Sequence, residues 1–173
     1  MSSNPSAISM HSASAPVFIK TLSNMLNWLD KAQAHAEARK FEPDNYLGLR
    51  LAPDMLPLKN QVQIASDAVK GCLARLAGTE APKWEDNEAT LDDLRARIRK
   101  TIDYAQSITP AQMAGSESKE IVIPRRTGEP LKFTGEEYLK HFALANFFFH
   151  ATTTYALLRQ AGVEIGKADF LRG

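Results

Sequence analysis

The sequence predicts an all-α fold, a four-helix bundle that carries one small β-hairpin. Apolar residues recur at alternating steps of four and three residues along the long segments, which is typical of bundle helices. The last long segment has neither proline nor glycine between residues 136 and 161, enough for about 40 Å of helix at 1.5 Å per residue. Two short β-like runs flank a turn that contains proline and glycine, and they predict a hairpin at about residues 120–133.

The first two helices are predicted from their apolar stripes and their end signals. The first is expected to begin at residue 14 or 15, with Pro16 tolerated in its first turn, and to end before Pro43. Residues 44–50 indicate a short helix or turn. The second is expected at about residues 57–77, with Gly78 as its stop. The two stripes consist of Phe18, Leu22, Met25, Leu29, Ala32 and Ala36, and of Leu58, Val62, Ala65, Val69, Cys72 and Leu76.

Thr90 is the expected N-cap of the third helix. Asp92 and Asp93 follow it in the first turn, where the helix dipole favours acidic side chains. The inward positions are Leu91, Leu94, Ile98, Thr101, Ile102 and Ala105, and the residues expected to point mostly outward are Arg95, Arg97, Arg99 and Lys100.

The fourth helix begins with a capping-box pattern, because the side chains of Thr134 and Glu137 can each bond the other's backbone amide. Gly162 is its expected stop, and the apolar residues within 163–171 are expected to pack back on the bundle. Three phenylalanines at 147–149 place rings on most sides of this helix. That indicates core packing, with one flank open to a subunit contact.

The composition is that of one soluble domain. The chain has 173 residues, and we expect residues 15–173 to form the domain and residues 1–14, small and polar, to be flexible. A formal net charge of +1 argues against nucleic-acid or acidic-membrane partners. Cys72, the one cysteine, lies on a buried stripe, which predicts an inert thiol and a reducing, cytoplasmic compartment. No signal peptide is expected, and the polar residues of the last helix exclude a membrane span.

Asn146 and His150 are the strongest candidates for a site. They are four residues apart, so they lie on one face of the last helix, one turn from each other. The functional interpretation is a ligand site for a metal or a small molecule; the structural one is a core histidine bonded to its helix neighbours. His141 lies about 900° before His150 on a straight helix and should point the opposite way.

Three further residues qualify less directly. Gln61 lies beside the apolar stripe of the second helix, where a buried amide would need hydrogen-bond partners. His35 is either at a pocket rim or a surface histidine, and Asp54 is most economically a helix N-cap. The sequence contains no Walker loop, no His-Glu-x-x-His, no Gly-x-Ser-x-Gly and no paired-cysteine zinc motif.

Segments along nearly the whole chain resemble, in the same order, the DUF1993 family. They are Leu29–Glu37, Leu49–Met55, Gln61–Ala65, Asp86–Glu88, Tyr138–Leu139, Asn146–His150, Gly162–Lys167 and Asp169–Leu171. That family is placed in the DinB/YfiT-like superfamily of metalloenzymes. The resemblance implies an up-down-down-up four-helix bundle that forms a homodimer.

For the site, the resemblance implies a degenerate metal centre. DinB-like proteins that bind a divalent metal use one histidine from the second helix and a His-x-x-x-His pair on a later helix. Here the pair corresponds to Asn146 and His150, and the position on the second helix falls near Gln61. Amides in place of two imidazoles should weaken the binding of zinc or nickel. The metal is then either lost or supplemented by His35 or Asp54. The family also carries proline where this chain has Ala145, and a kink there would change the phase between the histidines.

Two hypotheses follow. In the first, an uncharacterised DinB-like protein binds a small molecule, or weakly a divalent metal such as zinc or nickel, in a pocket of Gln61, Asn146 and His150 rimmed by His35 and Asp54. With a metal it would be a degenerate metal-dependent enzyme. In the second, the protein is a non-catalytic homodimer whose polar cluster only specifies packing.

Overall fold

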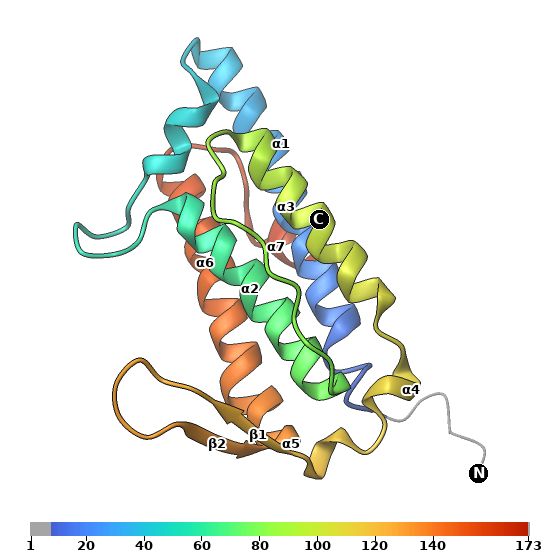
Figure 1. Cartoon of the computed structure of the whole chain (residues 1–173). Helices are drawn as coiled ribbons and strands as arrows, with labels where there is room; N and C mark the ends of the chain where they lie inside the picture. Colours follow the sequence, from blue (N-terminus) through green and yellow to red (C-terminus); the bar gives the residue numbers. More distant parts are fainter. Residues whose placement is uncertain (1–7, 173) are drawn as a thin grey trace.

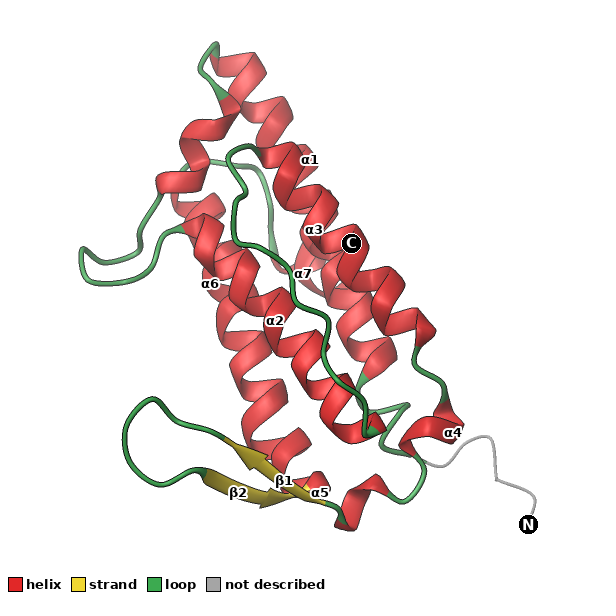
Figure 2. Cartoon of the chain, viewed as in Figure 1, coloured by secondary structure: helices red, strands yellow, loops and turns green. Residues whose placement is uncertain are grey.

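Four long helices lie side by side in the computed structural model, which describes residues 8–172 (Figures 1 and 2). They are α1 (Ala15–Arg39), α2 (Leu58–Ala77), α3 (Leu91–Ser107) and α6 (Leu144–Gln160). In Figure 1, α1 and α6 run upward and α2 and α3 downward, so the helices are arranged up-down-down-up as expected. Helix α2 packs on α3 and α6, and α1 packs on α3 and α6, which closes the bundle around one core.

The parallel arrangement of α2 and α3 requires a long connection. The chain leaves α2 at one end of the bundle and must return to the other end before α3 begins. Residues 78–90 make this crossover, which Figure 2 shows in green along the surface of the helices. It is the structural feature that separates this bundle from one with three short hairpin connections.

The expected helix ends are confirmed. Thr90 and Asp93 form a capping box at the start of α3, and Thr134 and Glu137 form another at the start of the last helix. Gly78 ends α2 in the left-handed conformation, at φ +73°. The 3₁₀ helix η1 (Pro43–Gly48) occupies the region predicted as a short helix or turn.

The last helix departs from a straight α-helix. It begins as α5 (Gly135–Glu137), continues as the π-helical turn η3 (Tyr138–Ala143), and becomes α-helical again in α6. A π-turn adds a residue to the turn, so the angle calculated for His141 on a straight helix does not apply. His141 is nevertheless exposed, whereas His150 is half-buried.

The hairpin consists of β1 (Glu120–Ile123) and β2 (Leu131–Thr134), which pair antiparallel, as predicted. Ile121 is buried, so one face of the hairpin lies on the helices. Two short elements, α4 (Pro110–Met113) and η2 (Ser116–Ser118), connect α3 to the hairpin.

The C-terminal tail packs back on the bundle, as expected. It ends in the short helix α7 (Lys167–Arg172), whose Phe170 stacks on Trp28 with 5.3 Å between ring centroids. Trp28 also donates a hydrogen bond from Nε1 to the carbonyl of Asp169, at 3.1 Å. Elsewhere in the core, the rings of Phe18 and Phe147 meet edge to face, with 4.9 Å between their centroids.

Two expectations about polar side chains are wrong. Arg95 and Arg97 were expected to point outward, but both are buried, because carboxylates from other elements pair with them. Asp54 is not a helix N-cap: Pro57 takes that position in α2, and Asp54 lies exposed in the preceding turn.

Of the segment predicted to be flexible, residues 1–7 lie outside the described residues. Residues 8–14 form hydrogen-bonded turns, with His11 Nε2 at 2.9 Å from the carbonyl of Ile108. Burial raises the pKa of the Cys72 thiol to about 12, consistent with an inert side chain. Within residues 8–172, no helix combines the length and the apolar character needed to cross a membrane.

Candidate functional site

His150 of α6 and Gln61 of α2 are in direct contact where the two helices pack. His150 Nδ1 lies 2.7 Å from Gln61 Oε1, and Gln61 Nε2 donates to the carbonyl oxygen of Leu56 at 2.8 Å. A carbonyl oxygen can only accept, so the amide nitrogen of Gln61 must face Leu56 and the amide oxygen must face the imidazole. That oxygen is also an acceptor, so Nδ1 carries the hydrogen and Nε2 of the neutral ring keeps its lone pair.

The surroundings of His150 favour this neutral form. Burial lowers the pKa of His150 below its ordinary value of about 6.5, because desolvation disfavours the imidazolium. The ring is therefore uncharged at pH 7. The hydroxyls of Thr153 and Thr154 bond the carbonyls of Phe149 and His150 in their own helix, so they are not directed at the imidazole.

Apolar side chains flank the pair. The Phe149 ring meets the His150 ring edge to face, with 5.1 Å between centroids, and Phe149 is 55% exposed. Leu56, whose carbonyl holds Gln61, is 48% exposed. Gln61 itself is buried, at 2% exposure. The arrangement therefore offers one acceptor nitrogen beside apolar surface.

The other predicted residues lie elsewhere. Asn146 is one turn from His150 but lines a separate cavity of about 200 Å³, formed with α2, β1 and η3. His35 bonds the hydroxyl of Tyr46 through Nδ1, at 2.5 Å, and its Nε2 lies beside Gly162. Asp54 is exposed in its turn. Within the described part of the chain, neither His35 nor Asp54 bonds His150 or Gln61.

The donor set fits a metal poorly. Among residues 8–172, no three histidine, cysteine, aspartate or glutamate side chains lie close enough together to hold an ion. Gln61 uses its amide oxygen on His150 and its amide nitrogen on Leu56, so it supports the imidazole instead of acting as a further ligand. His150 Nε2 and the neighbouring Asn146 amide remain, whereas a protein zinc site takes three or four protein ligands.

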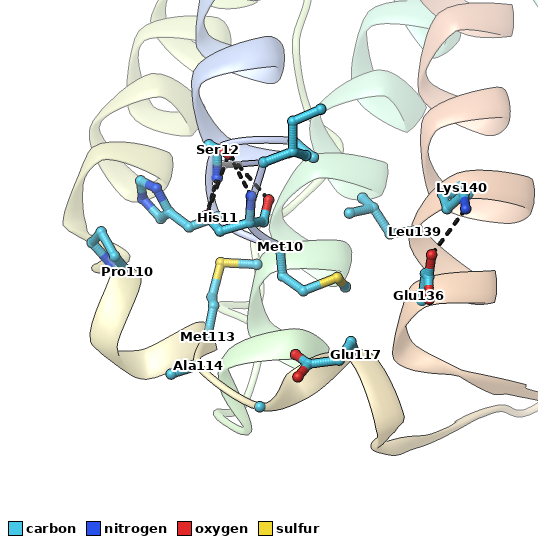
Figure 3. A pocket seen from close by; sticks show the side chains of 14 residues that line it. Met10, His11, Ser12, Pro110, Met113, Ala114, Glu117, Glu136, Leu139 and Lys140 are labelled. Atoms are coloured by element: carbon cyan, nitrogen blue, oxygen red, sulfur yellow. Dashed lines mark hydrogen bonds and ion pairs between the residues drawn. The ribbon is translucent and has the colours of Figure 1, made fainter. Parts of the chain in front are cut away.

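A cavity of about 960 Å³ lies between the residues before α1, the region of α4 and the start of the last helix (Figure 3). Met10, Met113 and Leu139 line it, and the ion pair of Glu136 and Lys140 stands at its edge, with 2.9 Å between Oε1 and Nζ. None of the candidate site residues predicted from the sequence lines it.

Two contributors to the His150 site were not predicted from the sequence. The first is the carbonyl of Leu56, which orients Gln61. The position of a backbone acceptor cannot be predicted from the pattern of side chains. The second is Phe149, which was predicted only as one of three packing aromatics. Its position next to His150 in the sequence could have indicated that the two rings are in contact.

Comparison with known proteins identifies relatives for nearly the whole chain. The family described as a domain of unknown function, DUF1993, matches residues 10–171. A crystal structure of a DinB family member protein from Shewanella denitrificans superposes with a TM-score of 0.87 at 41% sequence identity, covering 94% of this chain and 92% of that chain. No curated protein matches.

Proposed function

The chain belongs to the DUF1993 family and shares the fold of a DinB family member, and on this basis we propose that it binds a small molecule at His150 and Gln61. One observation carries the proposal: the hydrogen-bond chain from the Leu56 carbonyl through Gln61 to His150 Nδ1. It orients the ring and leaves the Nε2 lone pair for a donor on the ligand. Ligand-binding histidines are supported in the same way, through the ring nitrogen that does not bind.

The flanking side chains indicate what kind of ligand fits. Nε2 suits an O–H or N–H donor, and Phe149 and Leu56 suit an apolar portion beside it. A divalent ion is the weaker candidate, because one imidazole and a neighbouring amide form an incomplete set for zinc or nickel. If one were bound, His150 would hold it, and the ion would supply Lewis-acid chemistry.

A homodimer is the competing proposal, and the exposure of Phe149 favours it. Large exposed apolar side chains mark interaction surfaces when they gather, and Leu56, whose backbone carbonyl bonds Gln61, is a second exposed apolar residue. In this version a second copy covers Phe149, and the polar pair only specifies packing. For either version we propose a reducing compartment, the cytoplasm, which suits the buried thiol of Cys72.

The test compares His150→Ala with His141→Ala, a matched control on the same helix whose side chain is exposed. A fragment library is screened by thermal shift, and metal content is measured after dialysis against zinc or nickel chloride. We expect fragments that stabilise the wild type and His141→Ala but not His150→Ala, and substoichiometric metal in all three proteins. Stoichiometric metal that only His150→Ala loses would establish the metal form. No fragment binding, together with a dimer that Phe149→Ser dissociates in light scattering, would favour the competing proposal.

A further inference from the structure

The cavity beside Asn146 is a second candidate site, separate from His150 and Gln61. It lies between α2, β1 and η3, and Arg75 and Tyr138 line it together with Asn146. Fourteen residues separate Gln61 from Arg75 on α2, about 20 Å along the helix axis. Neither Gln61 nor His150 lines this cavity, so the two sites are distinct.

Arg75 is held in place but lacks a counter-ion. Its Nη1 donates to the hydroxyl of Tyr138 at 3.0 Å, and its guanidinium carbon lies 5.8 Å from the centre of that ring. The side chain bends back over Gly71, where an added Cβ would lie 2.7 Å from Nη1, so the glycine makes room for it. Within residues 8–172, no carboxylate lies within ion-pair distance of Arg75. The guanidinium is thus oriented and uncompensated.

Asn146 contributes a second group without a protein partner. It is half-buried, and its side-chain amide makes no hydrogen bond within the described part of the chain. Partly buried polar groups without a protein partner are satisfied by water or by a ligand. An amide offers both a donor and an acceptor, so it suits a hydroxyl or a second polar atom on a bound molecule.

Asp67 also lines the cavity, but its carboxylate is already paired with two cations. Its Oδ1 lies 2.9 Å from Arg97 Nη2 and 2.8 Å from Lys70 Nζ. Two cations on one carboxylate oxygen reduce the repulsion of an anion, although Arg97 is shared with Asp86 and Glu88. Of the two charged side chains that line the cavity, Arg75 is the one without an ion-pair partner within residues 8–172.

The π-helical turn η3 supplies much of the remaining wall. Tyr138 and Phe142 stack with 5.9 Å between ring centroids, and both face the cavity. Together with Ile64 and Ile123 they make part of the lining apolar. Insertions of a π-turn are frequent at functional sites. An apolar wall opposite a guanidinium favours a carbon skeleton that carries an acid group over a bare inorganic anion.

We propose that this cavity binds a small organic carboxylate. Arg75 holds the carboxylate, Tyr138 fixes the guanidinium, and Asn146 bonds a second polar group on the ligand. The volume of about 200 Å³ lies below the roughly 300–1,000 Å³ of pockets for drug-sized ligands, which limits the ligand to a short chain.

The test is a titration at constant ionic strength with sodium lactate, lactamide or sodium phosphate as the probe. Binding is monitored by ¹H–¹⁵N NMR. We expect saturable shifts with lactate that include the side-chain amide of Asn146, and no saturable shifts with lactamide or phosphate. Arg75→Gln should weaken lactate binding by about tenfold or more, since it removes a charge-assisted hydrogen bond. Arg99→Gln, on the exposed face of α3, is the matched control and should bind as the wild type does.

A second variant keeps the proposal testable if Arg75→Gln does not fold. Asn146→Ala removes no protein hydrogen bond, so this variant should fold. Its affinity for lactate should be lower than that of the wild type. The proposal is overturned if lactate gives no saturable shift, if lactamide or phosphate binds as well as lactate, or if every folded variant binds lactate unchanged. His150→Ala should leave lactate binding intact, so this proposal and the proposed function fail separately.

Discussion

At the scale of single residues, His150 shows how burial and one hydrogen bond set the charge and the tautomer of an imidazole. Burial places the pKa of His150 in the folded chain below the value of about 6.5 expected when unfolded. As the pH falls, the unfolded chain therefore binds this proton first. The stability associated with the neutral ring is complete above about pH 6.5 and is lost as the pH falls through the folded pKa.

We expect His150→Gln to remove this part of the pH dependence. The free energy of unfolding of the wild type should decrease more steeply between about pH 7.5 and about pH 5.5 than that of His150→Gln, because only the wild type loses the neutral imidazole. Urea denaturation at several pH values measures the difference. His141→Gln, whose side chain is exposed, should keep the wild-type slope. Parallel curves for the wild type and His150→Gln would contradict the argument.

The sequence could indicate His150 and Gln61 because each was a polar residue on or beside an apolar stripe. It could not show that Gln61 is already engaged at both ends, since the position of the Leu56 carbonyl depends on the turn before α2. It also could not separate Asn146 from His150. Helical spacing places Asn146 and His150 on one face of the helix. Their different surroundings depend on which residues of α2 lie opposite each side chain, and this pairing cannot be derived from the spacing.

At the scale of elements, the start of the last helix depends on a close backbone contact. Gly135 is buried against η2, and a Cβ added there would lie 1.8 Å from the carbonyl oxygen of Ser116. We expect Gly135→Ala to lower the free energy of unfolding by about 1–3 kcal/mol, as overpacking usually does. Gly48 has nothing within 4 Å of its added Cβ, so Gly48→Ala is the control and should be neutral or slightly stabilising in the same urea experiment. Equal stability of the two variants would show that the backbone at Ser116 moves away readily.

The ends of the elements were predictable and their irregularities were not. Thr90 and Thr134 cap their helices through local side-chain bonds that can be read from neighbouring residues. The π-turn at 138–143 contains no proline or glycine to indicate it. Arg95 and Arg97 were assigned to the outside because charged residues usually lie there, and only the partners supplied by other elements bring them inside.

At the scale of the whole molecule, the helix directions depend on the crossover between α2 and α3. Apolar periodicity predicts four packed helices but not their order in space, and the up-down-down-up arrangement was expected from the family resemblance alone. Arg97 of α3 attaches the crossover to the bundle, because it pairs with Asp86 and Glu88 of the crossover and with Asp67 of α2. Lys70 and Lys100 both lie over the ring of Trp84, at 4.5 and 4.7 Å from its centre.

Glu88 provides the test of that anchor. Burial alone would raise the pKa of Glu88, but hydrogen bonds from Gln63 and Arg97 outweigh it and hold the pKa below its ordinary value. Its contribution to stability is therefore complete above the unfolded value of about 4.3 and is lost as the pH falls through the folded pKa.

We expect Glu88→Gln to lower the free energy of unfolding at pH 7 by about 1–3 kcal/mol, because the substitution weakens a buried charge-assisted hydrogen bond. It should also flatten the loss of stability between about pH 5 and about pH 3, a window that spans the unfolded pKa of the carboxyl group. Glu85→Gln is the control on the same crossover, since its backbone carbonyl and not its side chain bonds Arg97. Urea denaturation across this pH range measures both effects. If the two variants were equally stable at pH 7, Glu88 would not be the residue through which the crossover is held, and the anchor would have to lie in the Arg97 pairs with Asp67 and Asp86.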